Sequence, residues 1–216
     1  MKVGIIKIGN LGDATMVAIN RRYTLSEIVL FEVDWRSVSL SPDQKFCGER
    51  WARGVDEVRE CDIAFVCMPT PPGPDGRLDT SAVDDVLSWL RVPLIVIRST
   101  MPEFCRDHEW TTFANSPHIH VVYQPTFKES LGLVVAGGTK AAEVCDFWRP
   151  ILGPETCYVA TNWGMAERIR ASVVRWREEL YAVCGLTDLE KELLGLLGDG
   201  VRTVLANHQG SVPLAY

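Results

Sequence analysis

Two glycines follow the first apolar segment of the chain at a spacing that suits phosphate binding. Residues 2–8 read Lys-Val-Gly-Ile-Ile-Lys-Ile, and residues 9–12 read Gly-Asn-Leu-Gly. Compared with the pattern G-x-G-x-x-G, Lys7 stands at the first glycine, while Gly9 and Gly12 keep the other two. Gly9 lets the backbone approach a pyrophosphate, and Gly12 lets a helix pack closely on its strand. The turn therefore predicts a binding site for the diphosphate of a dinucleotide.

A carboxylate follows this turn at the distance where such sites hold a ribose. Glu32 lies about 20 residues beyond Gly12, at the end of the apolar segment 27–33. There it could accept hydrogen bonds from both ribose hydroxyls. Asp34 is an alternative to Glu32, and Arg36 leaves a cofactor with a 2′-phosphate open. The residues favour NAD, with NADP as an alternative, and the competing interpretation is an ordinary strand-to-helix turn without a ligand.

The charge balance argues against nucleic-acid binding. The 216 residues include 22 Lys and Arg against 28 Asp and Glu, which gives a formal net charge of −6. The sequence has no basic stripe that could neutralise a phosphate backbone. No apolar run reaches the ~20 residues that span a bilayer, so we expect neither a nucleic-acid nor a membrane partner. The first residues form a strand-like segment instead of a signal pattern, which indicates a cytoplasmic protein.

The seven cysteines include no C-x-x-C pair. An odd number without close pairing indicates reduced thiols in a cytosol. We therefore expect most of them to be small, buried hydrophobic side chains. His118 and His120 would share one face of a strand, but no cysteine or carboxylate cluster accompanies them in the sequence. We expect no metal site.

Strand-like and helical segments alternate over the first three quarters of the chain. The proline-rich residues 69–76 cannot continue a strand or a helix, so they predict an exposed loop at the end of a strand. The alternation predicts an α/β fold with a doubly wound parallel sheet of the Rossmann type, forming one domain over residues 1–160. The expected strands are 2–8, 27–33, 62–68, 94–97, 119–123 and 133–136, and the expected helices are 11–22, 49–60 and one that begins at Asp79 or Thr80.

The last quarter of the chain has a different pattern. From Met165 to Cys184 the apolar residues recur at spacings of 3 and 4, which predicts one long helix. Thr187 to Glu190 has the spacing of a capping box and predicts a second, leucine-rich helix that ends near Gly198. The two expected helices would make residues 161–216 a helical extension. The apolar stripe of the first helix is longer than one small sheet domain can cover, so we expect a homodimer. The stripe consists of Ala166, Ile169, Val173, Trp176, Leu180 and Val183.

Four sequence blocks carry a more specific signal. They are CDIAFVCMPTP at residues 61–71, DGRLD at 75–79, IRSTMP at 97–102 and YQPTFKES at 123–130. In this order they resemble signatures of the UDP-glucose/GDP-mannose dehydrogenase family, which read approximately DVIFICVPTP, DGxxD, KSTVP and NPEFLREG. The resemblance covers residues 1 to about 138 and continues faintly through residues 166–184, which resemble the start of that family's long central helix.

The resemblance implies an NAD-dependent oxidoreductase that acts on the CH–OH group of a nucleotide sugar. Members of the family bind NAD on their N-terminal sheet and oxidise a primary alcohol twice through a cysteine-linked intermediate. By resemblance, the catalytic residues are Thr100, near the active-site water, Glu129 in the substrate loop, and Arg170, which stands at the family's catalytic lysine. The cofactor-binding residues implied in the same way are Gly9, Asn10, Leu11, Gly12, Glu32, Pro69, Thr70 and Thr100.

Several departures from the family pattern limit the expected chemistry. Thr126 replaces the first glutamate of the substrate loop, and Val174 replaces an asparagine of the central helix. Arg170 could stabilise negative charge, but arginine stays protonated and does not serve as a base. The family's block GxGGxCxxKD, which supplies the nucleophilic cysteine, has no counterpart, and neither has its C-terminal nucleotide-sugar domain. Without a thiolate to trap the aldehyde, the four-electron oxidation has no visible route.

These observations leave two main functional hypotheses. The first is a truncated, NAD-binding oxidoreductase that carries out at most a two-electron interconversion of an alcohol and a carbonyl group, on a nucleotide or nucleotide sugar. The second is a catalytically inactive Rossmann protein that senses a nucleotide or pairs with a partner subunit. A third hypothesis keeps the fold with a different small substrate, because fold does not determine chemistry.

Overall fold

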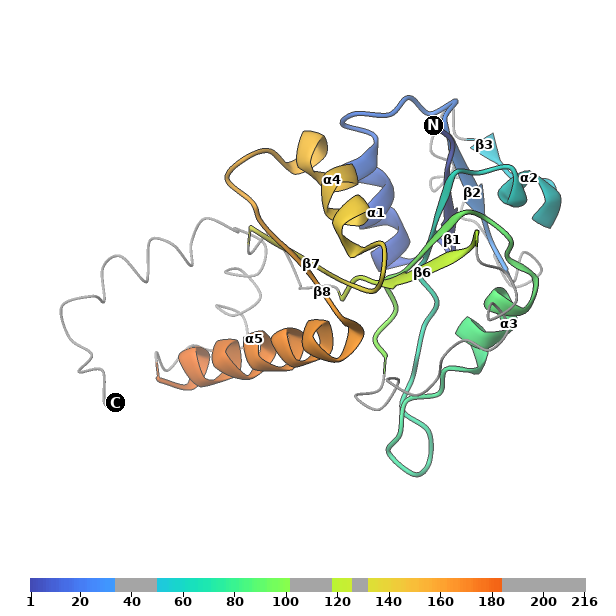
Figure 1. Ribbon diagram of the computed structural model, residues 1–216. Coiled ribbons are helices and arrows are strands. Elements are labelled where there is room, and N and C mark those ends of the chain that lie inside the picture. The colour runs from blue at the N-terminus through green and yellow to red at the C-terminus, as the bar shows by residue number, and fades with distance from the viewer. Residues whose placement is uncertain (34–49, 102–117, 126–131, 184–216) are drawn as a thin grey trace.

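A computed structural model describes residues 1–33, 50–101, 118–125 and 132–183 (Figure 1). In it an eight-stranded sheet has the strand order β3-β2-β1-β4-β5-β6-β7-β8. The strands are β1 (Val3–Ile6), β2 (Ile28–Phe31), β3 (Arg50–Trp51), β4 (Ile63–Val66), β5 (Leu94–Ile97), β6 (His120–Tyr123), β7 (Leu133–Gly137) and β8 (Cys157–Thr161). The helices are α1 (Asn10–Ile19), α2 (Val55–Arg59), α3 (Ser81–Trp89), α4 (Ala141–Leu152) and α5 (Trp163–Val183).

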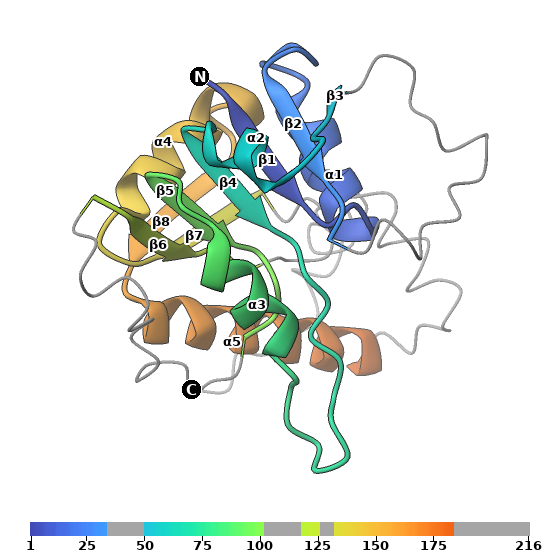
Figure 2. The same cartoon turned by 90° about the vertical axis from the view of Figure 1, so that its right-hand side faces the viewer.

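The central strands β1 and β4 are buried along their whole length. Both consist almost entirely of apolar residues, as expected for parallel strands that are covered on both faces. Helices α1 and α4 cover one face, while α3 and α5 lie on the other (Figures 1 and 2). The expected Rossmann-type α/β fold is confirmed. The carboxyl ends of the parallel strands β1, β2, β4 and β5 lie side by side, and we call this end of the strands the carboxyl edge of the sheet.

The structure corrects the expected sheet in its second half. β7 pairs antiparallel to β6 through Tyr123 and Gly137, so the sheet is mixed rather than wholly parallel. The reason lies in the connection, residues 124–132, which is shorter than the dozen or more residues that a parallel crossover usually needs. β8 then pairs parallel to β7 after the crossover helix α4.

Two short edge strands were missed by the sequence analysis. Within the segment 49–60, expected to be one helix, the chain forms β3 and then the five-residue helix α2. β8 was also missed, because its residues are only partly buried and it lies at the edge of the sheet, where the apolar pattern is weak. The remaining expected strands in the described residues were found at or within a few residues of their predicted positions.

Helix α5 begins where the helical extension was expected. Ala166 is completely buried and packs against the sheet at Gly137. The second expected helix, with Thr187, lies outside the described residues, and the homodimer and the boundary at residue 160 stay predictions. No helix in the described residues is both long and apolar enough to span a membrane.

The cysteines of the described segments follow the expectation in three of four cases. Cys61, Cys67 and Cys145 are buried, as small hydrophobic side chains should be, whereas Cys157 is exposed on the edge strand β8. For Cys157 the expectation of burial was therefore wrong. Burial raises the pKa of the Cys67 thiol to about 11, and it also raises the pKa of Cys145. Neither thiol is a ready nucleophile at neutral pH.

Replacing Gly12 should destabilise the fold. A Cβ atom at this position would lie 2.3 Å from the carbonyl oxygen of Lys7, which belongs to the backbone and cannot move aside. We expect Gly12→Ala to lower the free energy of unfolding by about 1–3 kcal/mol, even though alanine normally favours a helix over glycine. Urea denaturation measures this change.

The matched control is Gly9→Ala. Gly9 has φ −132°, which any residue adopts, and a Cβ atom there would meet no atom within 4 Å. We expect its free energy of unfolding to stay within about 0.5 kcal/mol of the wild-type value. Equal stability of Gly12→Ala and Gly9→Ala would contradict the close packing of α1 on β1.

Candidate functional site

The turn between β1 and α1 has the shape of an anion cradle. Gly9 is the residue before the first turn of α1, and no side chain among the described residues caps this end of the helix. The first amides of a helix lack partners within the helix and carry a partial positive charge. A Cβ atom on Gly9 would point into open space, so the backbone is accessible there. The turn therefore has room and donors for a diphosphate, as its glycine spacing predicted.

Lys7 shapes the start of this turn. It is the one residue other than glycine with positive φ in the described segments, at 70°. Its backbone amide still donates to the carbonyl oxygen of Phe31 at 2.9 Å, which extends the pairing of β1 with β2. Its carbonyl oxygen supports the close approach of Gly12. The left-handed conformation costs about 1–2 kcal/mol for a residue with a side chain. The backbone conformation at this position would therefore suit glycine better than lysine.

The side chain of Lys7 reaches Glu32, the expected ribose ligand. The Lys7 Nζ atom donates to Glu32 Oε1 at 2.7 Å, and the Ile8 amide donates to Glu32 Oε2 at 3.1 Å. The Glu32 side chain is 6% exposed, and that of Lys7 is 28% exposed. Both carboxylate oxygens thus have partners within the chain, and the Lys7 side chain is the more exposed member of the pair.

Asp13, which sequence reasoning did not single out, adds a second acid close to the turn. It follows Gly12 directly, and its Oδ1 atom is buried without a hydrogen-bond partner. Burial raises the pKa of Asp13 above its ordinary value. The sequence could have indicated Asp13, because it is a charged residue directly after Gly12, the last glycine of the pattern.

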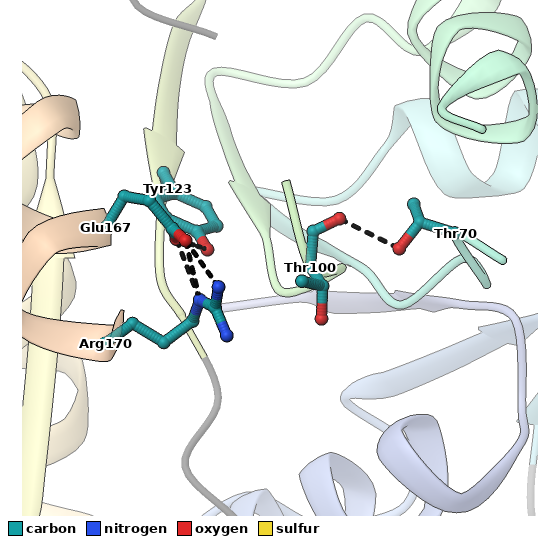
Figure 3. Close-up of polar contacts among 5 residues, drawn as sticks. All are labelled: Thr70, Thr100, Tyr123, Glu167 and Arg170. Atoms are coloured by element: carbon teal, nitrogen blue, oxygen red, sulfur yellow. Dashed lines mark hydrogen bonds and ion pairs between the residues drawn. The ribbon is translucent and has the colours of Figure 1, made fainter. Parts of the chain in front are cut away.

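The segments that follow β4 and β5 are joined by two threonines. The Thr70 hydroxyl donates to the Thr100 carbonyl oxygen at 2.8 Å, as Figure 3 shows. The structure thus brings together two residues that were expected in the site, although the Thr100 hydroxyl is not part of this bond. Pro69 is exposed in the loop before Thr70. This contact fixes the spacing of the two loops at the carboxyl edge of the sheet.

Arg170 lies in a separate cluster between β6 and α5 (Figure 3). Its Nε atom donates to both carboxylate oxygens of Glu167 at 2.9 Å, and the hydroxyl of Tyr123 donates to Glu167 Oε2 at 2.7 Å. Tyr123 also stacks on Trp163, with ring centroids 5.4 Å apart. The hydrogen bonds that Arg170 donates to Glu167 raise the pKa of Arg170 further above its already high ordinary value. Arg170 is therefore a fixed cation, and the sequence analysis missed its partner Glu167.

Arg98 forms a further polar cluster that sequence reasoning missed. It follows β5 directly and donates to the Thr15 hydroxyl of α1 at 2.6 Å. Its guanidinium carbon lies 5.5 Å from the ring centroid of Trp148, whose Nε1 atom donates to Gln124 at 2.9 Å. The Nε atom of Arg98 is buried without a partner, and burial lowers the pKa of this side chain. The sequence could have indicated this cluster, because Arg98 is a cationic residue directly after the apolar run of β5.

The expected site residues therefore fall into three groups. Gly9, Asn10, Leu11 and Gly12 form the turn with Glu32 near it, Thr70 joins Thr100, and Arg170 binds Glu167. Glu129, the third expected catalytic residue, lies outside the described residues, as do Asp34, Arg36 and Thr126. The catalytic roles of Thr100, Glu129 and Arg170 stay predictions.

Comparison with known proteins shows similarity in structure only. No protein-family profile matches the chain, and no curated protein matches it in sequence. A GDP-mannose dehydrogenase from Pseudomonas aeruginosa, solved as a ternary complex, matches with a TM-score of 0.68 and 16% identity over 86% of this chain and 52% of that chain. A UDP-glucose dehydrogenase from Pyrobaculum islandicum matches with a TM-score of 0.64 and 17% identity over 82% of this chain and 49% of that chain.

A third match comes from a different group of enzymes. An imine reductase from Myxococcus stipitatus, solved in complex with NADP⁺, has a TM-score of 0.58 and 18% identity over 96% of this chain and 75% of that chain. At such identities the matches show a shared fold. The resemblance to UDP-glucose/GDP-mannose dehydrogenases is confirmed at the level of structure, and the chain spans about half the length of the two dehydrogenases.

Removing the Tyr123 hydroxyl should change how stability depends on pH. Burial, followed by the nearby Glu167 carboxylate, raises the pKa of Tyr123 in the folded protein. In the unfolded chain tyrosine loses its proton near pH 10. Above that pH the unfolded state binds fewer protons than the folded state, so the stability contributed by Tyr123 is full below pH 10 and falls as pH rises.

We expect Tyr123→Phe to cost about 1–3 kcal/mol at pH 8, because the hydrogen bond to Glu167 is lost. Between pH 10 and 11 the difference from wild type should shrink by about 1 kcal/mol, since tyrosine in the unfolded chain is about half deprotonated at pH 10. Urea denaturation of both proteins at several pH values measures this, with Tyr158→Phe as a control, since the Tyr158 hydroxyl donates to a backbone carbonyl oxygen, not a carboxylate. A difference that does not change with pH would refute the buried Tyr123–Glu167 contact.

Proposed function

We propose that this protein binds a nicotinamide dinucleotide at the carboxyl edge of its sheet. The observation that carries the proposal is the open cradle at Gly9, in front of the uncapped start of α1. The diphosphate would lie against the first amides of this helix, which suit a dianionic group. The adenosine ribose would lie toward the end of β2, beside Lys7 and Glu32. NAD(H) is the cofactor that the sequence favoured, with NADP(H) as the alternative.

The fold comparisons support this placement. The matching imine reductase was solved with NADP⁺, and the fold of this chain overlaps it over 96% of its length. In open α/β sheets, ligands bind outside the carboxyl ends of the strands at the point where strand order reverses. Here that point lies between β1 and β4. From β1 the chain adds β2 and β3 on one side, and from β4 it adds β5 to β8 on the other side. The open position at Gly9 and the start of α1 follow β1 at that point, which supports the proposed placement.

As a first candidate activity we propose a two-electron interconversion of an alcohol and a carbonyl group on a nucleotide or nucleotide sugar. A bound nicotinamide supplies a hydride acceptor or donor. In this chain Thr100 would orient the reacting oxygen, Glu129 would take or give the proton, and Arg170 would stabilise negative charge. Cys67, with a pKa of about 11, offers no thiolate for a covalent intermediate, which supports limiting the reaction to two electrons.

A second candidate is binding without turnover. Arg170 is committed to Glu167 by two hydrogen bonds from its Nε atom and stands where a base would be needed. This contact favours a nucleotide-binding protein that acts through conformation or through a partner subunit. Absorbance at 340 nm separates the two candidates, since only an oxidoreductase converts NAD(P)⁺ to NAD(P)H in the presence of a substrate alcohol.

Isothermal titration calorimetry with NAD⁺, NADH, NADP⁺ and NADPH tests the proposed binding. We expect at least one of the four to bind, and Gly9→Val to weaken its affinity about 10-fold or more, because the valine side chain would fill the cradle. The free energy of unfolding of Gly9→Val should stay close to that of the wild type, which shows that the fold is intact.

Two further titrations make the result specific. UDP-glucose and GDP-mannose, added without a dinucleotide, report whether a nucleotide alone occupies the site. Absence of heat and of thermal stabilisation with all four dinucleotides at millimolar concentration would rule out the proposed function.

A further inference from the structure

The Lys7–Glu32 pair changes what the adenosine end of the proposed site presents to a ligand. In sites of this class, a free carboxylate at the end of the second strand accepts hydrogen bonds from the ribose hydroxyls and repels a phosphate there. In this chain both oxygens of Glu32 already accept hydrogen bonds, one from Lys7 Nζ at 2.7 Å and one from the Ile8 amide at 3.1 Å. Glu32 is therefore engaged before any ribose arrives.

The exposure of the two side chains points in the same direction. The Glu32 side chain is 6% exposed, whereas the Lys7 side chain is 28% exposed. A ligand that approaches this end of the turn would thus meet the Lys7 side chain before that of Glu32. Among the described residues, Glu32 is the only hydrogen-bond partner of Lys7 Nζ, and an ammonium group has three donors. Within the described part of the chain, the other two N–H donors of this group have no hydrogen-bond partner.

The charge of the pair matters as much as its donors. A lone buried carboxylate would make the subsite negative, and a 2′-phosphate on the ribose carries a charge of −1.5 to −2 near neutral pH, as other phosphate monoesters do. Lys7 cancels the charge of Glu32, so the repulsion that normally excludes a 2′-phosphate is absent. Hydrogen bonds between an ammonium group and phosphate oxygens are also stronger than those to a neutral hydroxyl.

We propose that Lys7 determines cofactor specificity, so that the site prefers a ribose that carries a 2′-phosphate and the protein takes NADP(H) over NAD(H). This inference rests on the proposed dinucleotide binding and names the cofactor class of that same site. Lys7 stands at the first position of the glycine pattern, where its left-handed backbone, with φ 70°, would suit glycine. A lysine at this position carries more backbone strain than a glycine would, which agrees with a role of its side chain in binding.

The test compares NADP⁺ and NAD⁺ by isothermal titration calorimetry on the wild type and on Lys7→Gly. We expect the wild type to bind NADP⁺ about 10-fold more tightly than NAD⁺. In Lys7→Gly the Glu32 Oε1 atom loses its ammonium partner, while Oε2 keeps the Ile8 amide. The carboxylate charge is then no longer compensated, so NAD⁺ should become the tighter ligand. The fragments 2′,5′-ADP and 5′-ADP, which lack the nicotinamide, should show the same order, since the difference lies at the ribose.

Two further variants keep the result interpretable. Lys7→Asn also removes the ammonium group and tolerates a left-handed backbone, so it replaces Lys7→Gly if that protein does not fold. Lys2→Met removes the other lysine of the same strand segment, whose Nζ atom binds Glu60 at 2.8 Å at the opposite edge of the sheet. The ratio of the two affinities should be unchanged in Lys2→Met.

The outcomes separate this inference from the proposed function. If the wild type binds NAD⁺ as tightly as NADP⁺ or more tightly, and Lys7→Gly leaves the ratio unchanged, Lys7 does not set specificity, although dinucleotide binding stands. If neither the wild type nor either Lys7 variant binds any dinucleotide, the proposed function fails and the specificity inference fails with it.

Discussion

The close approach of α1 to β1 is the constraint on which the candidate site depends. Gly12 leaves so little space above the Lys7 carbonyl that any side chain there would collide with the backbone. Helix α1 begins at Asn10, beside the open position at Gly9. Lys7, whose carbonyl oxygen makes this contact, has a left-handed conformation, and its side chain reaches Glu32 just after β2.

Electrostatics at the carboxyl edge follow from this geometry. The edge holds a lysine paired with a glutamate, a buried Asp13 carboxyl with a raised pKa and an arginine cluster on each face of the sheet. Arg98 lies on the face covered by α1 and α4, while Arg170 lies on the face covered by α5. Lys7 and Arg170 are each paired with a carboxylate, so this edge of the sheet holds charged groups of both signs.

The sequence was sufficient for the elements whose patterns are strong and local. The continuous apolar runs of β1, β4 and β5 predict buried strands, and the spacing of Ala166 and Ile169 predicts the start of α5. The sequence-based prediction failed where the structure of a segment depends on its connection or on its position in the sheet. The direction of β7 follows from a connection too short for a crossover, and β3 and β8 are edge strands that show little apolar patterning.

The site shows the same division. The turn and Glu32 could be placed from glycine spacing and chain distance, since both are properties of one βαβ unit. The contact of Lys7 with Glu32, of Arg170 with Glu167 and of Arg98 with Trp148 could not, because each joins side chains whose meeting depends on rotamer and backbone conformation. A positive φ at a lysine is not visible in its residue type.

The first turns of α5 are attached to the sheet at three points. Ala166 packs on Gly137, Trp163 stacks on Tyr123, and Glu167 accepts the Tyr123 hydroxyl. These contacts cross the expected boundary between residues 160 and 161. A shortened version of the chain designed for crystallisation or NMR would therefore need to retain α5 through Arg170, since an earlier end would leave a buried tyrosine and an apolar strip of β7 open to water.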